Sequence, residues 1–335
     1  MAITQRLLKF LRHCAGFGLV LLASLVFIKP ASGMGLMIGP AGSRCAAVQQ
    51  ESSASKTVPG LAANRLADSQ VARGQRDIAW AWLASPTRRY PHAALGSTEQ
   101  AGSLHVLRQP TAGHAAPLVL TLPLHRVFED RVPRLVDLDG DGTDEILLIE
   151  SDLLKGSALV VFGIRTIRVD GADQPALVEL ARGPFTGSTF RWLNPVGVAD
   201  FDGDGQLDIA SVTTPHIGGV LTLYHYRPQK TASSSSSPGQ LVPFASVMDV
   251  SNHKMGDLEQ SLAAIVTLPG QRPAIIVPDM TLQALHAFRW EEPGRWKELA
   301  DVKPLPARVQ RIVATAQGAC AKLVDQSWHL IRLAP

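Results

Sequence analysis

Beyond residue 76, the chain alternates short apolar runs with groups of Gly, Pro, Asp and Asn. Each run has about four to seven residues and is rich in Val, Ile and Leu, a pattern typical of β-strands. No segment shows the i, i+3, i+4 apolar face of a three-turn helix. The pattern therefore predicts an all-β chain. The expected strands are 78–83, 104–108, 118–122, 146–150, 158–163, 177–181, 209–213, 220–226, 263–267, 274–277, 285–290, 297–302, 309–314, 319–324 and 328–333.

An acidic motif occurs twice among these runs. Residues 137–146 read DLDGDGTDEI, and residues 200–209, 63 positions later, read DFDGDGQLDI. An eroded copy lies at 267–273, and a fourth unit starts at Val309. Each unit supplies four strands, A to D, with the acidic loop between A and B. The chain thus reads as a series of repeats.

Four-stranded sheets that recur every ~45–65 residues are typical of a β-propeller. Residues 77–335 are long enough for about five blades at this period. The first repeat lacks a strand A and the last lacks a strand D, so strands shared between the two ends are expected to close the ring. The predicted fold is a β-propeller of about five four-stranded blades with calcium-binding A–B loops.

The acidic loops carry the oxygen donors of a calcium site. Carboxylates at alternate positions of a tight loop converge on one point, and Gly142 and Gly205 permit the turn. The carbonyl of the seventh position adds a further donor. The alternative is a solvated acidic turn without an ion, which is also the expectation for the eroded loop. The predicted ligands of two structural Ca²⁺ sites are Asp137, Asp139, Asp141, Thr143, Glu145, Asp200, Asp202, Asp204, Gln206 and Asp208.

Residues 137–147 and 200–210 resemble the calcium loops of FG-GAP/VCBS-repeat proteins, which are similar to the N-terminal propeller of integrin α-chains. The resemblance covers about residues 77–335 and rests on these two motifs. The order VFEDRVPRLVDLDGDG, then TTPHIGGVL, is similar to exported proteobacterial VCBS-repeat proteins. Within this span, the family's Phe-Gly and Gly-Ala-Pro motifs are absent apart from Phe162-Gly163. The resemblance implies a calcium-binding propeller of a kind that serves adhesion and recognition in other proteins.

Residues 1–33 have the three parts of an export signal. Arg6, Lys9 and Arg12 precede the apolar run 14–28, and small residues follow Pro30. The expected location is periplasmic or secreted after cleavage. The alternative is an uncleaved anchor facing the periplasm, although the apolar run is short for a membrane span. Residues 34–76 are expected to be a flexible linker.

The export segment also accounts for the basic charge of the chain. It contains four Lys or Arg and no acid, so its removal takes the formal net charge from +3 to −1. A near-neutral chain does not have the excess of basic residues that is typical of nucleic-acid-binding proteins. Cleavage leaves two cysteines, Cys45 and Cys320. An exported protein allows them to form a disulfide, and the alternative is two unpaired thiols.

Three histidines map to the face opposite the acidic loops. His92 and His216 lie in B–C loops, and His253 lies in a D–A loop. One hypothesis is that they form a shared site for a transition metal or an anionic or sugar ligand. The alternative is three unrelated histidines, each bonded to its own turn. The acids expected on the same face are Glu129, Asp130, Asp152 and Asp249.

No catalytic motif is present: the chain has no Gly-x-Ser-x-Gly elbow, no His-Glu-x-x-His pair and no phosphate-binding glycine loop. The sequence therefore predicts a non-enzymatic binding or interaction module with a protein or glycan ligand. A metal-assisted hydrolase or lyase that uses the histidine-bearing face is the alternative. A purely structural envelope component is a third possibility.

Overall fold

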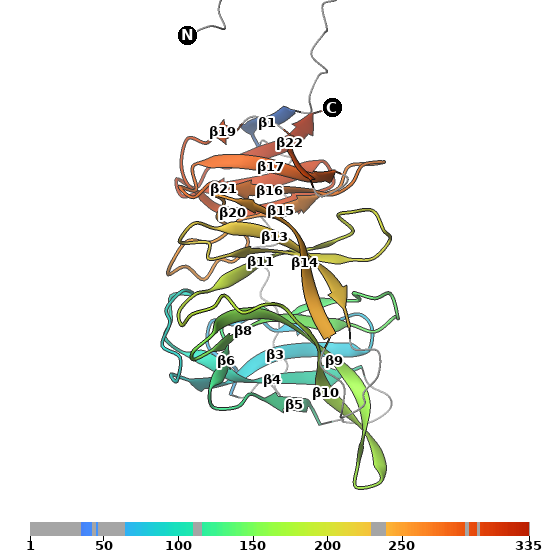
Figure 1. Cartoon of the computed structure of the whole chain (residues 1–335). Helices are drawn as coiled ribbons and strands as arrows, with labels where there is room; N and C mark the ends of the chain where they lie inside the picture. Colours follow the sequence, from blue (N-terminus) through green and yellow to red (C-terminus); the bar gives the residue numbers. More distant parts are fainter. Residues whose placement is uncertain are drawn as a thin grey trace, which may run out of the picture. The chain divides into compact units, whose positions relative to one another are not determined.

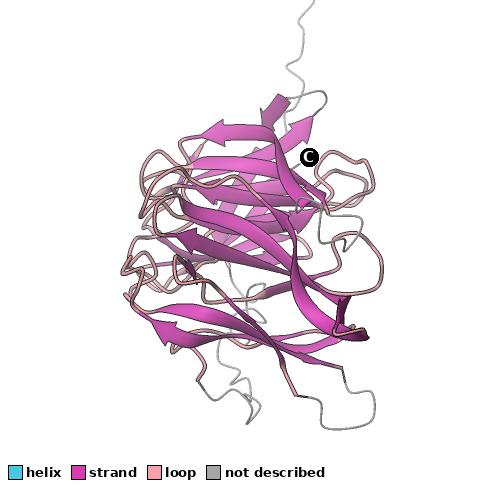
Figure 2. Cartoon of the chain, turned by 60° about the horizontal axis from the view of Figure 1, so that its bottom comes forward, coloured by secondary structure: helices cyan, strands magenta, loops and turns pink. Residues whose placement is uncertain are grey.

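Strands and their connecting loops make up the described part of the computed structural model, and no α-helix occurs in that part (Figure 2). The structure describes residues 35–41, 45, 64–109, 116–228, 239–291, 295–299 and 302–334. The predicted export signal, 1–33, lies outside them. Within the described part, no helix has the length and hydropathy needed to cross a membrane. The prediction of an all-β chain is confirmed.

Within the described residues, the strands form three hydrogen-bonded sheets of four, 13 and five strands. Their consecutive antiparallel pairings divide these sheets into five four-stranded meanders (Figure 1). The first contains β2 (Ala72–Arg73), β3 (Ile78–Thr87), β4 (Gln100–Arg108) and β5 (Leu118–Thr121). The second contains β7 (Arg134–Val136), β8 (Glu145–Asp152), β9 (Gly156–Val169) and β10 (Ala172–Arg182). The third contains β11 (Leu193–Ala199), β12 (Asp208–Thr213), β13 (Val220–Arg227) and β14 (Gly239–Met248).

The fourth meander contains β15 (Ala264–Val266), β16 (Ala274–Pro278), β17 (Ala284–Glu291) and β18 (Arg295–Glu298). The fifth contains β20 (Val309–Thr315), β21 (Gly318–Leu323), β22 (Trp328–Ala334) and β1 (Gly35–Pro40). Two further strands extend these sheets: β6 (Arg126–Phe128) pairs with β8 and β4, and β19 (Lys303–Pro304) pairs with β17. Every apolar run that was expected to be a strand overlaps one of these elements.

The fourth strand of the last meander comes from the start of the chain. β1 pairs antiparallel with β22, from Gly35 opposite Ala334 to Pro40 opposite His329, and Figure 1 shows the two strands side by side. Both β1 and β2 lie in the segment expected to be a flexible linker, which corrects that prediction at these strands. The local sequence has weak strand propensity, and pairing with distant strands determines its structure. The part of the expected linker at 46–63 lies outside the described residues.

Alternate side chains of β8 lie in two different cores. All eight residues of this strand are buried. Ile146 and Leu148 pack in a cluster with the first meander, whereas Leu147 and Ile149 pack in a cluster with the third. Successive strand side chains point to opposite faces, so a continuously apolar strand suits a sheet covered on both sides. The run EILLIE therefore places the second meander between two neighbours.

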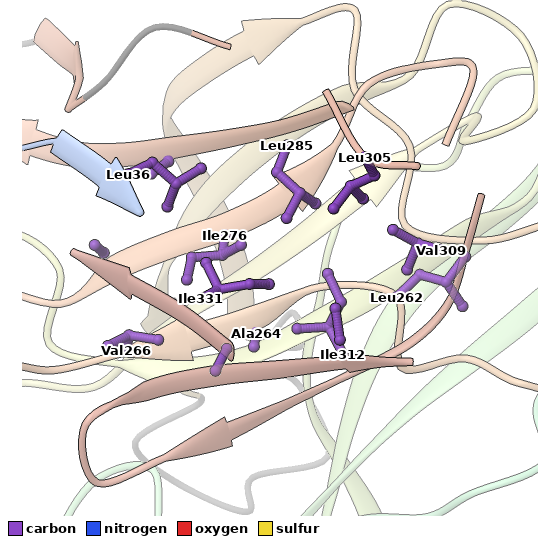
Figure 3. Packing of buried hydrophobic residues seen from close by; sticks show 14 of the residues in the cluster. Leu36, Leu262, Ala264, Val266, Ile276, Leu285, Leu305, Val309, Ile312 and Ile331 are labelled. Atoms are coloured by element: carbon purple, nitrogen blue, oxygen red, sulfur yellow. The ribbon is translucent and has the colours of Figure 1, made fainter. Parts of the chain in front are cut away.

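Four clusters of buried apolar side chains join consecutive meanders, from the first to the fifth. In the cluster between the fourth and fifth, Ile276 and Leu285 pack with Ile312 and Ile331, and Leu36 of β1 joins them (Figure 3). Full burial of each such side chain contributes about 1.5–3 kcal/mol. Among the described residues, no core cluster joins the fifth meander back to the first.

Cys45 and Cys320 form a disulfide, so the prediction that they pair is supported over the alternative of two free thiols. Their Cα atoms lie 5.9 Å apart, although 275 residues separate them in the sequence. The bridge is buried in a small apolar cluster with Ala41 and Leu330. It joins the segment that follows β1 to β21.

Candidate functional site

The two acidic loops connect the first and second strands of the second and third meanders, and they fold alike. The amide N–H of Gly142 donates to Asp137 Oδ2 at 3.1 Å, and that of Gly205 donates to Asp200 Oδ2 at 3.1 Å. The two glycines have φ angles of 87° and 86°, a left-handed conformation that strongly favours glycine. The repeat seen in the sequence is therefore also a repeat of backbone geometry.

The last acid of each loop folds back to the loop's second residue. The N–H of Leu138 donates to Glu145 Oε2 at 2.9 Å, and the N–H of Phe201 donates to Asp208 Oδ2 at 3.1 Å. Both acids begin buried strands, β8 and β12, and both are almost fully buried. These hydrogen bonds fix one buried carboxylate next to the second residue of each loop.

The structure brings carboxylate oxygens of each loop together. One oxygen from each of Asp137, Asp139 and Glu145 lies within 4.8 Å of the others. In the second loop, the group within 4.8 Å consists of Asp200, Asp202 and Asp204, so the acids at the first and third positions of the motif recur but the third member differs. Seven of the ten predicted ligands therefore lie in groups that could hold a metal. They are these six acids and Asp208, whose group is described below. No group of described acids and histidines includes Asp141, whose Oδ1 accepts the Thr143 N–H at 2.8 Å. The backbone carbonyls of Thr143 and Gln206 stay predicted ligands.

Two oxygens of the first loop are buried without a hydrogen-bond partner among the described residues. They are Asp137 Oδ1 and Glu145 Oε1. The guanidinium of Arg165 lies 3.6 Å from Glu145 Oε1, too far for a hydrogen bond. Buried carboxylate oxygens normally have a partner, and a hard cation with oxygen ligands would supply one. The donor set therefore fits Ca²⁺.

Burial, together with neighbouring negative charge, raises the pKa of two acids in the loops. Burial, followed by the charges of Asp139 and Asp141, raises the pKa of Glu145 to about 7. Burial, followed by the charge of Asp202, raises the pKa of Asp208 to about 6. A cation at either site would favour the ionised carboxylate and reverse these shifts.

His225 at the second acidic loop was not identified from the sequence. Its Nδ1 lies 3.0 Å from Asp208 Oδ1 and its Nε2 lies 3.9 Å from Asp202 Oδ2. The three residues form a further group of donors within 4.8 Å. His225 lies directly opposite Asp208 in the β12–β13 pair, so only the strand register reveals the contact.

Two of the three predicted face histidines are in direct contact. His216 Nε2 lies 2.8 Å from His253 Nδ1, and His253 Nε2 lies 2.9 Å from the carbonyl oxygen of Asp257. Trp192 stacks on His216 at an interplanar angle of 4° and meets His253 edge-on. Burial lowers the pKa of both imidazoles to about 4. Both are therefore neutral at physiological pH.

His92 lies on a neighbouring loop, bonded to a buried acid. Its Nδ1 is 2.6 Å from Glu129 Oε1, and Phe190 stacks on its ring. Ser151 Oγ donates to the other Glu129 oxygen at 2.6 Å. Burial is the main cause of the lowered pKa of His216, and the nearby His92 imidazole adds to it. Among the described residues, the three histidines do not form a group with ligand atoms within 4.8 Å.

Of the four acids expected near these histidines, Glu129 is the one that bonds to a histidine of this face. Asp130 is buried, and its Oδ2 accepts hydrogen bonds from Arg134 at 2.8 Å and from the Ile149 N–H at 3.0 Å. Asp152 Oδ1 accepts the N–H of Leu154 at 2.9 Å, which fixes the turn after β8. Asp249 has a positive φ of 65° at the end of β14. These three acids are held by local structure.

Exposed apolar side chains gather on the loops around the histidines. Leu124 and Leu154 are 81% and 80% exposed. Hydrogen bonds connect the loops: the Leu153 N–H donates to the His125 carbonyl, and Thr189 Oγ1 donates to that of Leu153. The N–H of Gly256 also donates to the Ala94 carbonyl at 2.9 Å, which ties the His253 loop to the His92 loop. The exposed apolar residues on these loops, called the apolar rim, are Leu124, Leu154, Phe190, Ile217, Met255 and Leu258.

Comparisons with known proteins assign no family to this chain. No protein-family model matches it, and no curated protein matches it. The resemblance of the acidic loops to FG-GAP/VCBS repeats stays a prediction.

Proposed function

We propose that the chain is an exported, calcium-stabilised β-propeller of five blades that acts as a non-enzymatic binding module. In this proposal each meander is a blade, and β1 completes the last blade as a strand shared between the ends of the chain. The four core clusters are the interfaces between consecutive blades. A closed ring requires a fifth interface, between the sheet of β20–β22 and that of β2–β5.

Calcium is proposed as the cofactor of the two acidic loops. The buried oxygens of Asp137 and Glu145 that accept no hydrogen bond among the described residues support this, as does the matching backbone turn of the second loop. Ligands held within one loop make the role structural, because the ion would fix the turn that leads into β8 or β12. The Cys45–Cys320 disulfide supports export, since such bridges persist in oxidising compartments.

The apolar rim is the observation that carries the binding function. Six large apolar side chains are exposed on hydrogen-bonded loops at one end of the sheets. Large apolar side chains exposed together on neighbouring loops are typical of sites that bind another molecule. We propose a protein or glycan ligand, with the rim supplying apolar contacts and His92 and His216 supplying polar ones.

Two probes test this function: a glycan array, and affinity capture from an envelope extract with the captured species quantified by mass spectrometry. The variant Leu154→Ser/Ile217→Ser removes two rim contacts, and Val119→Ser/Val324→Ser is the control with exposed side chains outside the rim. We expect one species to be retained by the wild type and the control and reduced at least about tenfold in the rim variant. Equal retention by the rim variant would contradict the proposal.

A metal-assisted hydrolase or lyase at the same face is the second candidate. The 2.6 Å contact between His92 Nδ1 and Glu129 favours it, because a buried carboxylate can orient an imidazole for general-base work. Among the described residues, no hydroxyl or thiol is hydrogen-bonded to the other nitrogen of His92. Loss of hydrolysis of an ester or glycoside panel in His92→Ala, with hydrolysis retained in His286→Ala, would establish this alternative.

A further inference from the structure

His225 adds a nitrogen donor to the second acidic loop. One nitrogen of His225 and one oxygen from each of Asp202 and Asp208 all lie within 4.8 Å of one another. The contacts are 3.0 Å, from His225 Nδ1 to Asp208 Oδ1, and 3.9 Å, from His225 Nε2 to Asp202 Oδ2. Two ligands of one tetrahedral zinc ion, with bonds of about 2.0–2.1 Å, lie about 3.4 Å apart. The three side chains are therefore close enough to share one ion.

The fold holds each of these donors in place. Asp208 begins β12 and is 1% exposed, and His225 lies directly opposite it on β13. The His225 ring stacks on Phe244 of β14, with the ring centroids 4.0 Å apart and the planes at 10°. Asp202 Oδ1 accepts the N–H of Asp204 at 3.1 Å, and its other oxygen is the one next to His225. The donors are thus oriented by strand pairing, ring stacking and the loop's own turn.

The first acidic loop has no such nitrogen. Its donor group contains only carboxylates, from Asp137, Asp139 and Glu145. The following strand, β9, places the guanidinium of Arg165 3.6 Å from Glu145 Oε1. A guanidinium has no lone pair to give to a metal, whereas a neutral imidazole has one. The two loops share a backbone turn but differ in the donors that their strands supply.

We propose that Asp202, Asp208 and His225 bind a divalent transition metal of the zinc class. Imidazole suits zinc and other transition metals, whereas calcium takes oxygen ligands. Zinc sites with three protein ligands keep a fourth position open for water or a bound molecule. The site goes beyond the proposed function, which gives the second loop calcium alone. Asp202 also belongs to the carboxylate group with Asp200 and Asp204, so the loop holds one of the two ions at a time.

The test is calorimetric titration of the metal-free full chain with Zn²⁺, with a parallel titration with Co²⁺ followed by its visible absorption. We expect one equivalent of Zn²⁺ for the wild type. His225→Phe keeps an aromatic ring beside Phe244 and removes both nitrogens, and it should weaken Zn²⁺ binding at least about tenfold. Asp202→Asn, at a partly exposed side chain, should do the same and decides the test if His225→Phe is unstable. Excess Ca²⁺ should raise the apparent Kd of the wild type for Zn²⁺.

Two variants are the controls. His286→Ala removes an imidazole whose Nδ1 also lies 2.7 Å from a carboxylate, that of Glu298. Because His286 belongs to no donor group among the described residues, its removal should leave Zn²⁺ affinity unchanged. Asp139→Asn makes at the first loop the change that Asp202→Asn makes at the second, and it should keep the Zn²⁺ equivalent.

The zinc and calcium titrations separate this site from the proposed calcium loops. A wild type that binds Zn²⁺ but no Ca²⁺ would support the zinc site and contradict the calcium proposal. The zinc site is overturned if the wild type binds no stoichiometric Zn²⁺, or if a folded His225→Phe or Asp202→Asn variant binds it as well as the wild type. Loss of the Zn²⁺ equivalent in Asp139→Asn, or independent binding of Zn²⁺ and Ca²⁺, would place the zinc elsewhere and also overturn it.

Discussion

Cys45 and Cys320 are bonded across 275 residues of sequence, next to the strand pair that joins the two ends of the described chain. A disulfide acts mainly by restricting the unfolded chain, and the loop it closes here is very long. We expect Cys45→Ser/Cys320→Ser to lower the free energy of unfolding by about 2–5 kcal/mol, measured by urea denaturation. Reduction of the wild type should give the same loss. Unchanged stability in both would contradict the role assigned to the bridge.

β1 should be an integral strand and not a linker. Leu36 is 3% exposed and packs in the core between the fourth and fifth meanders, whereas its neighbour Met37 is 53% exposed. Leu36→Asp places a charge in that core and should destabilise the fold by at least about 2 kcal/mol. Met37→Asp should change stability by about 0.5 kcal/mol or less. Similar thermal unfolding of the two variants would show that β1 does not pair as described.

The double-sided burial of β8 predicts that both of its faces matter. Leu147→Ala and Leu148→Ala create cavities in different cores. Each should lower the free energy of unfolding, measured by chemical denaturation, by about 2–5 kcal/mol. Leu154→Ala, at a side chain that is 80% exposed, is the matched control and should have a small effect. If either core variant behaved like Leu154→Ala, that side of the second meander would be uncovered in solution.

Calcium should stabilise the protein more at high pH than at low pH. The pKa of Glu145 is about 7 in the folded chain against an ordinary 4.5, and that of Asp208 is about 6 against 3.8. The folded state therefore holds protons that the unfolded state releases, so without calcium the free energy of unfolding falls as pH rises through these windows. Bound calcium would take the place of the protons on these two carboxylates. With calcium, the free energy of unfolding should therefore no longer fall as the pH rises.

Thermal unfolding at pH 5 and pH 8, with calcium and with chelator, measures the effect. The gain in melting temperature from calcium should be larger at pH 8. Glu145→Gln cannot ionise and should reduce the pH dependence measured in chelator. A calcium effect that is equal at both pH values would show that these acids are not linked to the ion.

The strands and the acidic loops could be predicted from the sequence because their signals are local. Apolar runs such as 146–150 have the length and composition of strands. Each DxDGDG motif fixes its own turn, because the N–H of its second glycine donates to the carboxylate of its first aspartate. β1 could not be predicted in this way, because MGLMIG has no alternation and its partner β22 lies at the other end of the chain. Only tertiary pairing makes it a strand.

The candidate sites divide in the same way. His92, His216 and His253 could be recognised from the sequence because each lies in a predicted loop on one face. The residues that position their rings could not be recognised in this way. Glu129 was expected only as an acid on the same face, and Trp192 was not expected at all, since a lone tryptophan at a strand start resembles a core residue. His225 reaches Asp208 through strand register, which a single sequence does not reveal.

The central claim, that the two acidic loops bind calcium, is tested most directly by isothermal titration calorimetry of the metal-free protein with Ca²⁺. We predict two equivalents for the wild type, one for Asp139→Ala, one for Asp202→Ala and none for the double variant. At a hundredfold excess over Kd, each occupied site should add about 2.7 kcal/mol to the free energy of unfolding. A wild type that binds no calcium, or a double variant that still binds two equivalents, would contradict the account.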